Sequence, residues 1–166
     1  MVRSKRVAQG ISLVYSLLAV CLCFTNPEIT AISLHPGGGI ASRFSYPFFH
    51  TSFLHAMMNC WCLISIVFIY DVSLISLIAG YATAITYPVG LLSQLYLEPH
   101  FTIGFSGVCY YLLGRVSLYV KEKAYWQICI CTTILIGFIF PHTIDVWLHV
   151  YCYMFGLIGA FLNKKV

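Results

Sequence analysis

The sequence is dominated by six apolar runs that follow one another with only short polar interruptions. A helix that crosses a bilayer needs ~20 mostly apolar residues, so six crossings take about 120 residues and leave roughly 46 for loops and tails. We therefore expect an all-α polytopic membrane protein, one compact six-helix bundle without a separate soluble domain. The expected helices cover about residues 7–24, 49–70, 72–95, 104–120, 124–140 and 143–162.

Charged residues are scarce and lie at the edges of these runs. Only 8% of the chain is charged and its mean hydropathy is +0.88, whereas a soluble domain is about 25% charged. A water-soluble globular fold is therefore excluded. The net charge of +4 does not indicate a nucleic-acid partner, because the basic residues flank apolar runs instead of lining one face. The partner implied by this composition is the lipid bilayer.

The positions of the basic residues predict how the chain is oriented in the membrane. Arg43 falls on one side of the six-span arrangement, and the other side holds Arg3, Lys5, Arg6, Lys121, Lys123, Lys164 and Lys165. Basic loops stay in the cytoplasm, so we expect a multi-pass integral protein of a bacterial inner (cell) membrane with both termini cytoplasmic. Arg115, near the inner end of the fourth run, is expected to snorkel to the interface.

The interruptions predict where the helices end. Residues 25–48 contain Pro27, Pro36 and three consecutive glycines, and we expect them to form a long outer loop. Residues 96–103 are expected to form a second outer loop. Within the third run, Tyr87-Pro88-Val89-Gly90 predicts a kink or a thinning of the span.

The eight cysteines do not indicate a metal site or a disulfide framework. They lie inside apolar runs, and neither a CxxC motif nor a Cys/His spacing typical of zinc is found. Free cysteine behaves as a small buried apolar residue. We therefore expect no metal and no cofactor.

A few polar side chains nevertheless lie at membrane depth, where each is costly unless it is paired or faces water. They form three groups: His50, His55 and Asn59 in the second expected helix, Ser106 in the fourth, and His149 in the sixth. All three helices enter from the outer side in the predicted topology. The three groups should therefore converge at one depth.

The spacing within these groups favours a shared site. His55 and Asn59 are four residues apart and share a helix face, and Ser106 and Tyr110 have the same spacing. Taken alone, Gly-x-Ser-Gly is more often a packing motif than a nucleophile, so the argument depends on the combination. Small surfaces for close helix approach are offered by Gly104, Gly107, Gly114, Gly156 and Gly159.

These motifs strongly resemble the rhomboid family of intramembrane serine proteases. The resemblance rests on His50-Thr-Ser-Phe-Leu-His55-Ala-Met-Met-Asn59, on Gly104-Phe-Ser106-Gly107-Val-Cys-Tyr110, and on His149 followed seven residues later by Gly156. It covers the second to sixth runs, and the first run fits the family's six-helix core. The resemblance implies a single rhomboid-like membrane domain over residues 1–166.

The resemblance also implies a Ser-His dyad. Ser106 is the expected nucleophile, His149 is the expected general base, and Tyr110 packs against the imidazole. Asp145 lies one helical turn before His149 and could touch it. However, the resemblance implies a dyad and not a triad, so no carboxylate is expected to complete the site.

The remaining motif residues have implied supporting roles. His55 and Asn59 are the expected oxyanion donors, together with the backbone N–H of Ser106. His50 is expected to be more structural than catalytic. Gly104, Gly107 and Gly156 are supporting residues whose small surfaces let the helices approach closely.

The chain departs from the family pattern at three places. The Trp-Arg pair usual in the first outer loop is missing, with Ser42-Arg43 as a partial, shifted match. The glycine expected three residues after the histidine is Cys152, and the small residue expected just before it is Leu148. None of these departures removes a catalytic group.

An intramembrane protease of this kind needs water in its site and a substrate with an extended backbone, because a helix hides its carbonyls. We therefore expect membrane-anchored protein substrates with a small residue at the cleavage point and Gly or Pro nearby. The third and fifth helices and the loop before His149 would move to admit them. Two alternatives stay open: a catalytically silent rhomboid-like protein that binds transmembrane segments, and a small transporter with polar groups at mid-depth.

Overall fold

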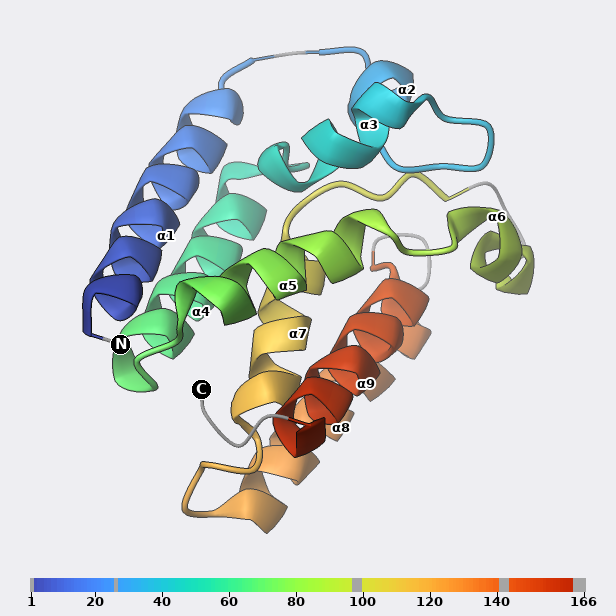
Figure 1. Cartoon of the computed structure of the whole chain (residues 1–166). Helices are drawn as coiled ribbons and strands as arrows, with labels where there is room; N and C mark the ends of the chain where they lie inside the picture. Colours follow the sequence, from blue (N-terminus) through green and yellow to red (C-terminus); the bar gives the residue numbers. More distant parts are fainter. Residues whose placement is uncertain (1, 26, 97–99, 141–143, 163–166) are drawn as a thin grey trace.

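The computed structural model describes residues 2–25, 27–96, 100–140 and 144–162, and these ranges are mainly helical (Figure 1). The longer helices are α1 (Val2–Leu22), α4 (Phe53–Ile69), α5 (Leu74–Ile85), α7 (Ser106–Val116), α8 (Lys123–Ile139) and α9 (Val146–Leu162). The shorter segments are α2 (Ile29–Ile32), α3 (Ile40–Ser45), η1 (Tyr46–Phe48), α6 (Val89–Leu92) and η2 (Ser93–Leu95). Part of the expected 96–103 loop, the start of the expected 143–162 helix, and Lys164 and Lys165 lie outside the described residues.

The lengths of the helices do not by themselves give six membrane spans. Among the described residues, Ser4–Leu22 is long and apolar enough to cross a bilayer as one helix. Two bent pairs raise this number to three if each pair is one span: Ile40–Phe48 with Phe53–Ile69, bent by 83°, and Leu74–Ile85 with Val89–Leu95, bent by 48°. α8 and α9 are apolar but shorter, and α7 has 11 residues. The six-span count therefore stays a prediction.

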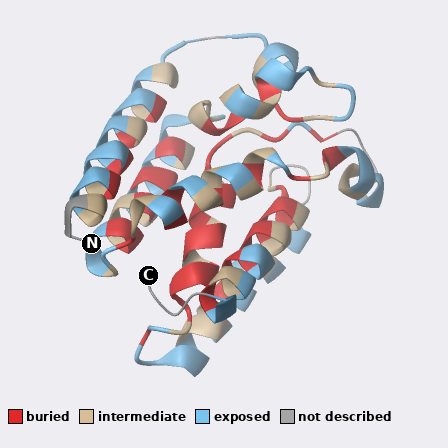
Figure 2. Ribbon diagram, in the orientation of Figure 1, coloured by how far each residue is buried: buried red, intermediate tan, exposed pale blue. Residues whose placement is uncertain are grey.

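α7 lies at the centre of the bundle and is mostly buried, whereas α1 and α8 carry many exposed residues (Figure 2). It packs most extensively against α9, then against α5 and α4. By contrast, α8 buries only Ile130 and Gly137 among its described residues. Large apolar side chains such as Leu17 on α1 and Leu135 on α8 point outward, which is the pattern of a protein whose outer surface faces lipid.

The contact between α7 and α9 depends on two glycines. A Cβ at Gly114 would overlap the carbonyl oxygen of Tyr153, and a Cβ at Gly156 would overlap that of Tyr111. The two backbones therefore touch directly, as small residues allow in membrane helix pairs. This contact fixes the depth of α7 relative to α9.

The segment expected to be an outer loop over residues 25–48 is partly helical, and side-chain hydrogen bonds hold it on the end of α5. The Arg43 guanidinium donates to the carbonyl oxygens of Ile85, at 3.2 Å, and Tyr87, at 3.0 Å. The Tyr46 hydroxyl donates to the carbonyl oxygen of Ala84 at 2.9 Å. These carbonyls lie at the C-terminus of α5, where a cation is favourable. The shifted arginine therefore anchors the loop although the usual Trp-Arg pair is missing.

Two further expectations concern the third and fourth runs. The kink predicted at Tyr87-Pro88 is observed as the break between α5 and α6. Arg115 is buried within α7, and its guanidinium donates to the Tyr119 hydroxyl, one turn nearer the inner end of the run, at 3.4 Å. Its expected snorkelling to the membrane interface stays a prediction. The arginine stem packs against Gly159 on α9, where a Cβ would lie in ordinary contact with the arginine Cδ at 3.5 Å.

We predict that Gly156→Ala destabilises the fold, because the added methyl group would collide with backbone and not with a movable side chain. Overpacking of this kind costs about 1–3 kcal/mol. Thermal unfolding of the detergent-solubilised protein should show a lower midpoint. Gly10→Ala is the matched control, because a methyl group added there would meet no heavy atom within 4 Å; equal midpoints for the two variants would contradict the α7–α9 contact.

Candidate active site

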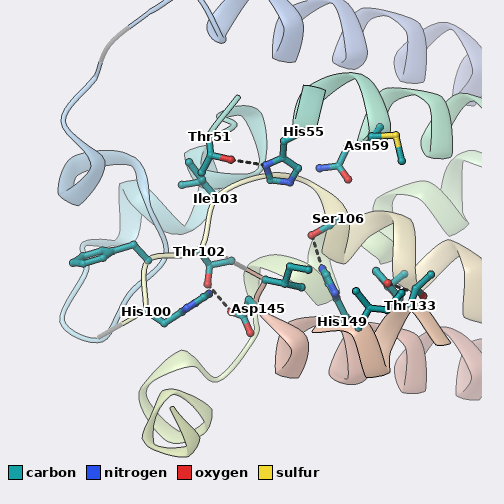
Figure 3. A pocket seen from close by; sticks show the side chains of 15 residues that line it. Thr51, His55, Asn59, His100, Thr102, Ile103, Ser106, Thr133, Asp145 and His149 are labelled. Carbon is teal, nitrogen blue, oxygen red and sulfur yellow. Dashed lines mark hydrogen bonds between the residues drawn. The ribbon is translucent and has the colours of Figure 1, made fainter. Parts of the chain in front are cut away.

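A cavity of about 340 Å³ opens at the end of the bundle where α4, α7 and α9 present their polar groups (Figure 3). His55 and Asn59 line it from α4, Ser106 from the start of α7, and His149 from the first turn of α9. The structure therefore brings the three polar groups of the sequence into one place. The segment before α7 and part of α8 complete the walls.

Ser106 and His149 form a hydrogen-bonded pair. The Ser106 Oγ lies 2.8 Å from Nε2 of His149, a buried side chain. With the ring proton on Nδ1, Nε2 accepts the serine O–H, which is the geometry that a general base needs. The Tyr110 ring stacks on the imidazole, with the centroids 4.1 Å apart and the planes at 15°. The imidazole is therefore held on one face by a ring and at one edge by the serine.

Tyr110 also connects the pair to α8. Its hydroxyl donates to Thr133 Oγ1 at 3.0 Å, and Thr133 lines the cavity from α8. Thr133 was missed by sequence reasoning, because nothing in an apolar run indicates which threonine faces a neighbouring helix.

His55 and Asn59 lie together against the backbone of Gly104. A Cβ at Gly104 would lie 3.0 Å from His55 Cε1 and 3.3 Å from Asn59 Nδ2, and φ of Gly104 is +104°. Only glycine fits this combination of positive φ and close approach. Thr51 Oγ1 lies 3.0 Å from Nδ1 of His55. The other ring nitrogen, Nε2, therefore faces Gly104.

Asn59 contributes a donor without a partner. Its side-chain nitrogen is buried and finds no acceptor among the described residues. Figure 3 shows Asn59 and His55 across the cavity from His149, with Ser106 between them. A buried unsatisfied donor is rare in a folded protein, and this one faces the space beside the serine.

His50, by contrast, is packed and does not line the cavity. Its ring meets the rings of His55 and Phe105 edge-on, with centroids 5.0 Å apart in each case. It therefore lies behind His55, where it supports the position of that ring.

The two departures near His149 are accommodated at Gly107. A Cβ at Gly107 would lie 3.2 Å from both Cys152 Sγ and Leu148 Cγ. The larger side chains on α9 therefore fill the space that Gly107 leaves on α7. Each of the eight cysteines is a free thiol, and the described residues include no cluster of three or more metal-ligating side chains.

Asp145 is a buried residue whose role was not predicted. Its carboxylate binds the hydroxyls of Tyr87, Tyr96 and Thr102 and the backbone N–H of Leu148, and not the His149 ring. The Asp145 carboxylate therefore makes no hydrogen bond to the His149 imidazole, the contact that the sequence had left open. Its position three residues before Leu148 is the spacing of a helix N-cap, a signal that the sequence did contain.

Comparison with known proteins gives a family. A model of the Rhomboid domain matches residues 38–165, more than half of the chain. This range includes every residue of the cavity described above. No curated protein and no solved structure matches the chain.

We predict that Gly104→Ala destabilises the protein and displaces His55. A residue with a side chain at this φ costs of order 1–3 kcal/mol, and the methyl group would press on the imidazole. The midpoint of thermal unfolding should fall. Gly90→Ala, where an added Cβ would enter open space and φ is not positive, should leave the midpoint unchanged; a Gly104→Ala protein as stable as this control would contradict the assigned backbone geometry.

Proposed function

Because the chain belongs to the rhomboid family and is an integral membrane protein, we propose that it is an intramembrane serine endopeptidase. Its substrates are membrane-anchored proteins, cleaved within or near their transmembrane segment. The observation that carries the proposal is the 2.8 Å hydrogen bond between Ser106 Oγ and His149 Nε2 inside a cavity among apolar helices. A hydroxyl and an imidazole at that distance are the minimum set for acyl transfer.

In the acylation half of the reaction, His149 removes the proton from Ser106 as the oxygen attacks the scissile carbonyl carbon. The tetrahedral intermediate then collapses, and the C–N bond breaks. His149 returns the proton to the leaving amine. A water molecule repeats the sequence on the acyl-serine, which releases the new carboxylate and restores the hydroxyl.

The negative charge of the intermediate needs donors that are already in place. Asn59 Nδ2 and His55 Nε2 are the proposed side-chain donors, and the backbone N–H of Ser106 is the third. As the first residue of α7, Ser106 has an N–H that the helix does not use. The helix dipole at this N-terminus favours the same charge.

No carboxylate among the described residues is hydrogen-bonded to the imidazole ring. Tyr110 stacks on the ring, and Ser106 binds its Nε2. We therefore propose a dyad, in which the stacked tyrosine does the orienting that an aspartate does in a triad.

Entry of a substrate requires that a helix beside the cavity moves. Of the two helices expected to move, α8 is the more loosely held, since among its described residues it buries only Ile130 and Gly137. α5 packs closely on α7. We propose that α8 moves to admit the substrate segment.

The proposed orientation places both termini in the cytoplasm. The ion pair between Lys5 and Asp71, 3.3 Å long, joins the start of α1 to the turn between α4 and α5. This turn lies at the end of α4 opposite to His55 and Asn59. The cavity would therefore open towards the outer side of the membrane, where water can enter.

We predict that Ser106→Ala and His149→Ala each abolish cleavage of a tagged single-span substrate. The substrate is co-expressed with each variant, and the shortened product is measured by immunoblot. Wild type should give the product, and a fluorophosphonate probe should label Ser106 in wild type only.

The control is Gly10→Ala, which alters α1 without touching the cavity. A product that persists with Ser106→Ala would refute the nucleophile assignment. A wild type that neither cleaves a panel of substrates nor reacts with the probe would refute the protease proposal in favour of the silent rhomboid-like protein.

We predict that Asn59→Ala lowers kcat by ~10²-fold or more, because one preorganised oxyanion donor is lost. Purified enzyme and a single-span substrate in detergent give kcat and KM. Cys60→Ala is the matched control, since this side chain on α4 bonds the Ser16 carbonyl oxygen on α1 and does not line the cavity. A wild-type kcat for Asn59→Ala would remove the amide from the proposed oxyanion site.

A further inference from the structure

Asp145 is a buried carboxylate, 6% exposed, at the start of α9. One oxygen, Oδ1, accepts hydrogen bonds from the hydroxyls of Tyr96, at 2.8 Å, and Tyr87, at 3.3 Å, and from the backbone N–H of Leu148, at 2.9 Å. The other oxygen, Oδ2, accepts the Thr102 hydroxyl at 2.5 Å. Buried carboxylates are rare unless they are paired or fully hydrogen-bonded, and this one is held by neutral donors.

The four donors come from separate parts of the chain. Tyr87 lies between α5 and α6, and Tyr96 follows η2. Thr102 belongs to the segment that leads into α7, and Leu148 is in the first turn of α9. A single carboxylate therefore ties three remote segments to the N-terminus of the helix that carries His149.

The pair Thr102–Asp145 precedes the pair Ser106–His149 by the same number of residues in both segments of the chain. Thr102 is four residues before Ser106, and Asp145 is four residues before His149. Figure 3 shows both hydrogen bonds along the same cavity. The Thr102–Asp145 hydrogen bond therefore joins the two segments just before Ser106 and His149, at the same distance along the chain from each.

Thr102 is itself fixed by its backbone. Its N–H donates to the carbonyl oxygen of Leu34 at 3.0 Å, and its own carbonyl oxygen accepts the Leu34 N–H at 2.8 Å. Two residues later, the N–H of Gly104 donates to the Tyr46 carbonyl oxygen at 2.9 Å. The segment before Ser106 thus has a rigid backbone, and Asp145 is its side-chain connection to α9.

Asp145 acts at a distance from the imidazole. Its carboxylate makes no hydrogen bond to the His149 ring, whose Nδ1 has no partner among the described residues. Its bond to the Leu148 N–H instead caps the helix, because Asp145 precedes the helix and Leu148 is its third residue.

We propose that Asp145 is a positioning residue for the Ser106–His149 pair, an inference that rests on the proposed protease function. By binding Thr102 and capping α9 with one carboxylate, it holds the serine oxygen and the imidazole nitrogen at hydrogen-bond distance. Its geometry, not its charge, is what the reaction uses.

The test compares Asp145→Ala with Asp145→Asn in kcat and KM on a single-span substrate. Asp145→Ala loses all four hydrogen bonds, so kcat should fall about tenfold or more, since small misplacements of reacting groups carry large penalties. KM should stay within about twofold of wild type, because both carboxylate oxygens are engaged by hydrogen bonds within the protein. Asp145→Asn should retain most of kcat, since its oxygen can still accept from Leu148 and its amide nitrogen can donate to the Thr102 oxygen.

Ser73→Ala is the matched control. Ser73 also caps a helix, α5, by accepting the Ser76 N–H at 3.2 Å, but it lies far along the chain from the dyad and does not line the cavity. Its kcat should equal that of wild type, with thermal unfolding recorded for every variant to establish that each is folded. A wild-type kcat for Asp145→Ala overturns the proposal, and so does an Asp145→Asn protein as slow as Asp145→Ala, because the charge would then be what matters.

A thiol probe separates this inference from the proposed function. In a Ser106→Cys background, a neighbouring imidazole promotes the thiolate, and mass spectrometry measures how fast iodoacetamide alkylates position 106. Asp145→Ala and His149→Ala should each slow alkylation several-fold at neutral pH, and Asp145→Asn should not. If wild type fails to cleave but this pattern holds, the protease proposal fails and the positioning role of Asp145 stands; if wild type cleaves but Asp145→Ala leaves alkylation unchanged, the positioning role fails.

Discussion

The direct backbone contact between α7 and α9 is the constraint on which the rest of the site depends. Gly114 and Gly156 remove the Cβ atoms that would keep the two helices apart. Ser106 begins one of these helices and His149 lies in the first turn of the other. A small shift between the helices would therefore change the 2.8 Å distance between Ser106 Oγ and His149 Nε2. The geometry of the site thus depends directly on how these two helices pack.

The buried polar groups of the described residues differ in how completely they are hydrogen-bonded. Arg43 binds two carbonyls near the end of α5, and Asp145 binds four donors. Asn59, at the cavity, is left with a buried donor that no described residue accepts. Other buried polar atoms without a partner, such as the Ser16 hydroxyl and both ring nitrogens of His50, lie away from the cavity. The unsatisfied Asn59 donor therefore supports a binding role only together with its place beside Ser106 and His149.

Of the polar residues that line the cavity, His55, Asn59, Ser106 and His149 could be singled out from the sequence because their signals are local. The four-residue spacings of His55 with Asn59 and of Ser106 with Tyr110 are helical, and the apolar background made each polar residue conspicuous. The network of Asp145 could not be predicted, since Tyr87, Tyr96 and Thr102 reach it only through tertiary packing. The helices within residues 25–48 were missed for the same reason: they are short, and their stability comes from bonds such as that of Arg43 to α5.

A triad carboxylate both orients the histidine and stabilises the imidazolium that forms during the reaction. In the dyad proposed for this chain the two tasks are separated. Orientation comes from the Tyr110 stack and from the capped N-terminus of α9, while the negative charge of Asp145 is directed at neutral hydroxyls away from the ring. A carboxylate in contact with His149 would need its other oxygen satisfied in the same apolar surroundings, whereas at the helix N-terminus backbone and hydroxyl donors surround it. The arrangement therefore gives up a hydrogen bond between carboxylate and imidazolium and keeps the rigid geometry that a Ser-His dyad requires.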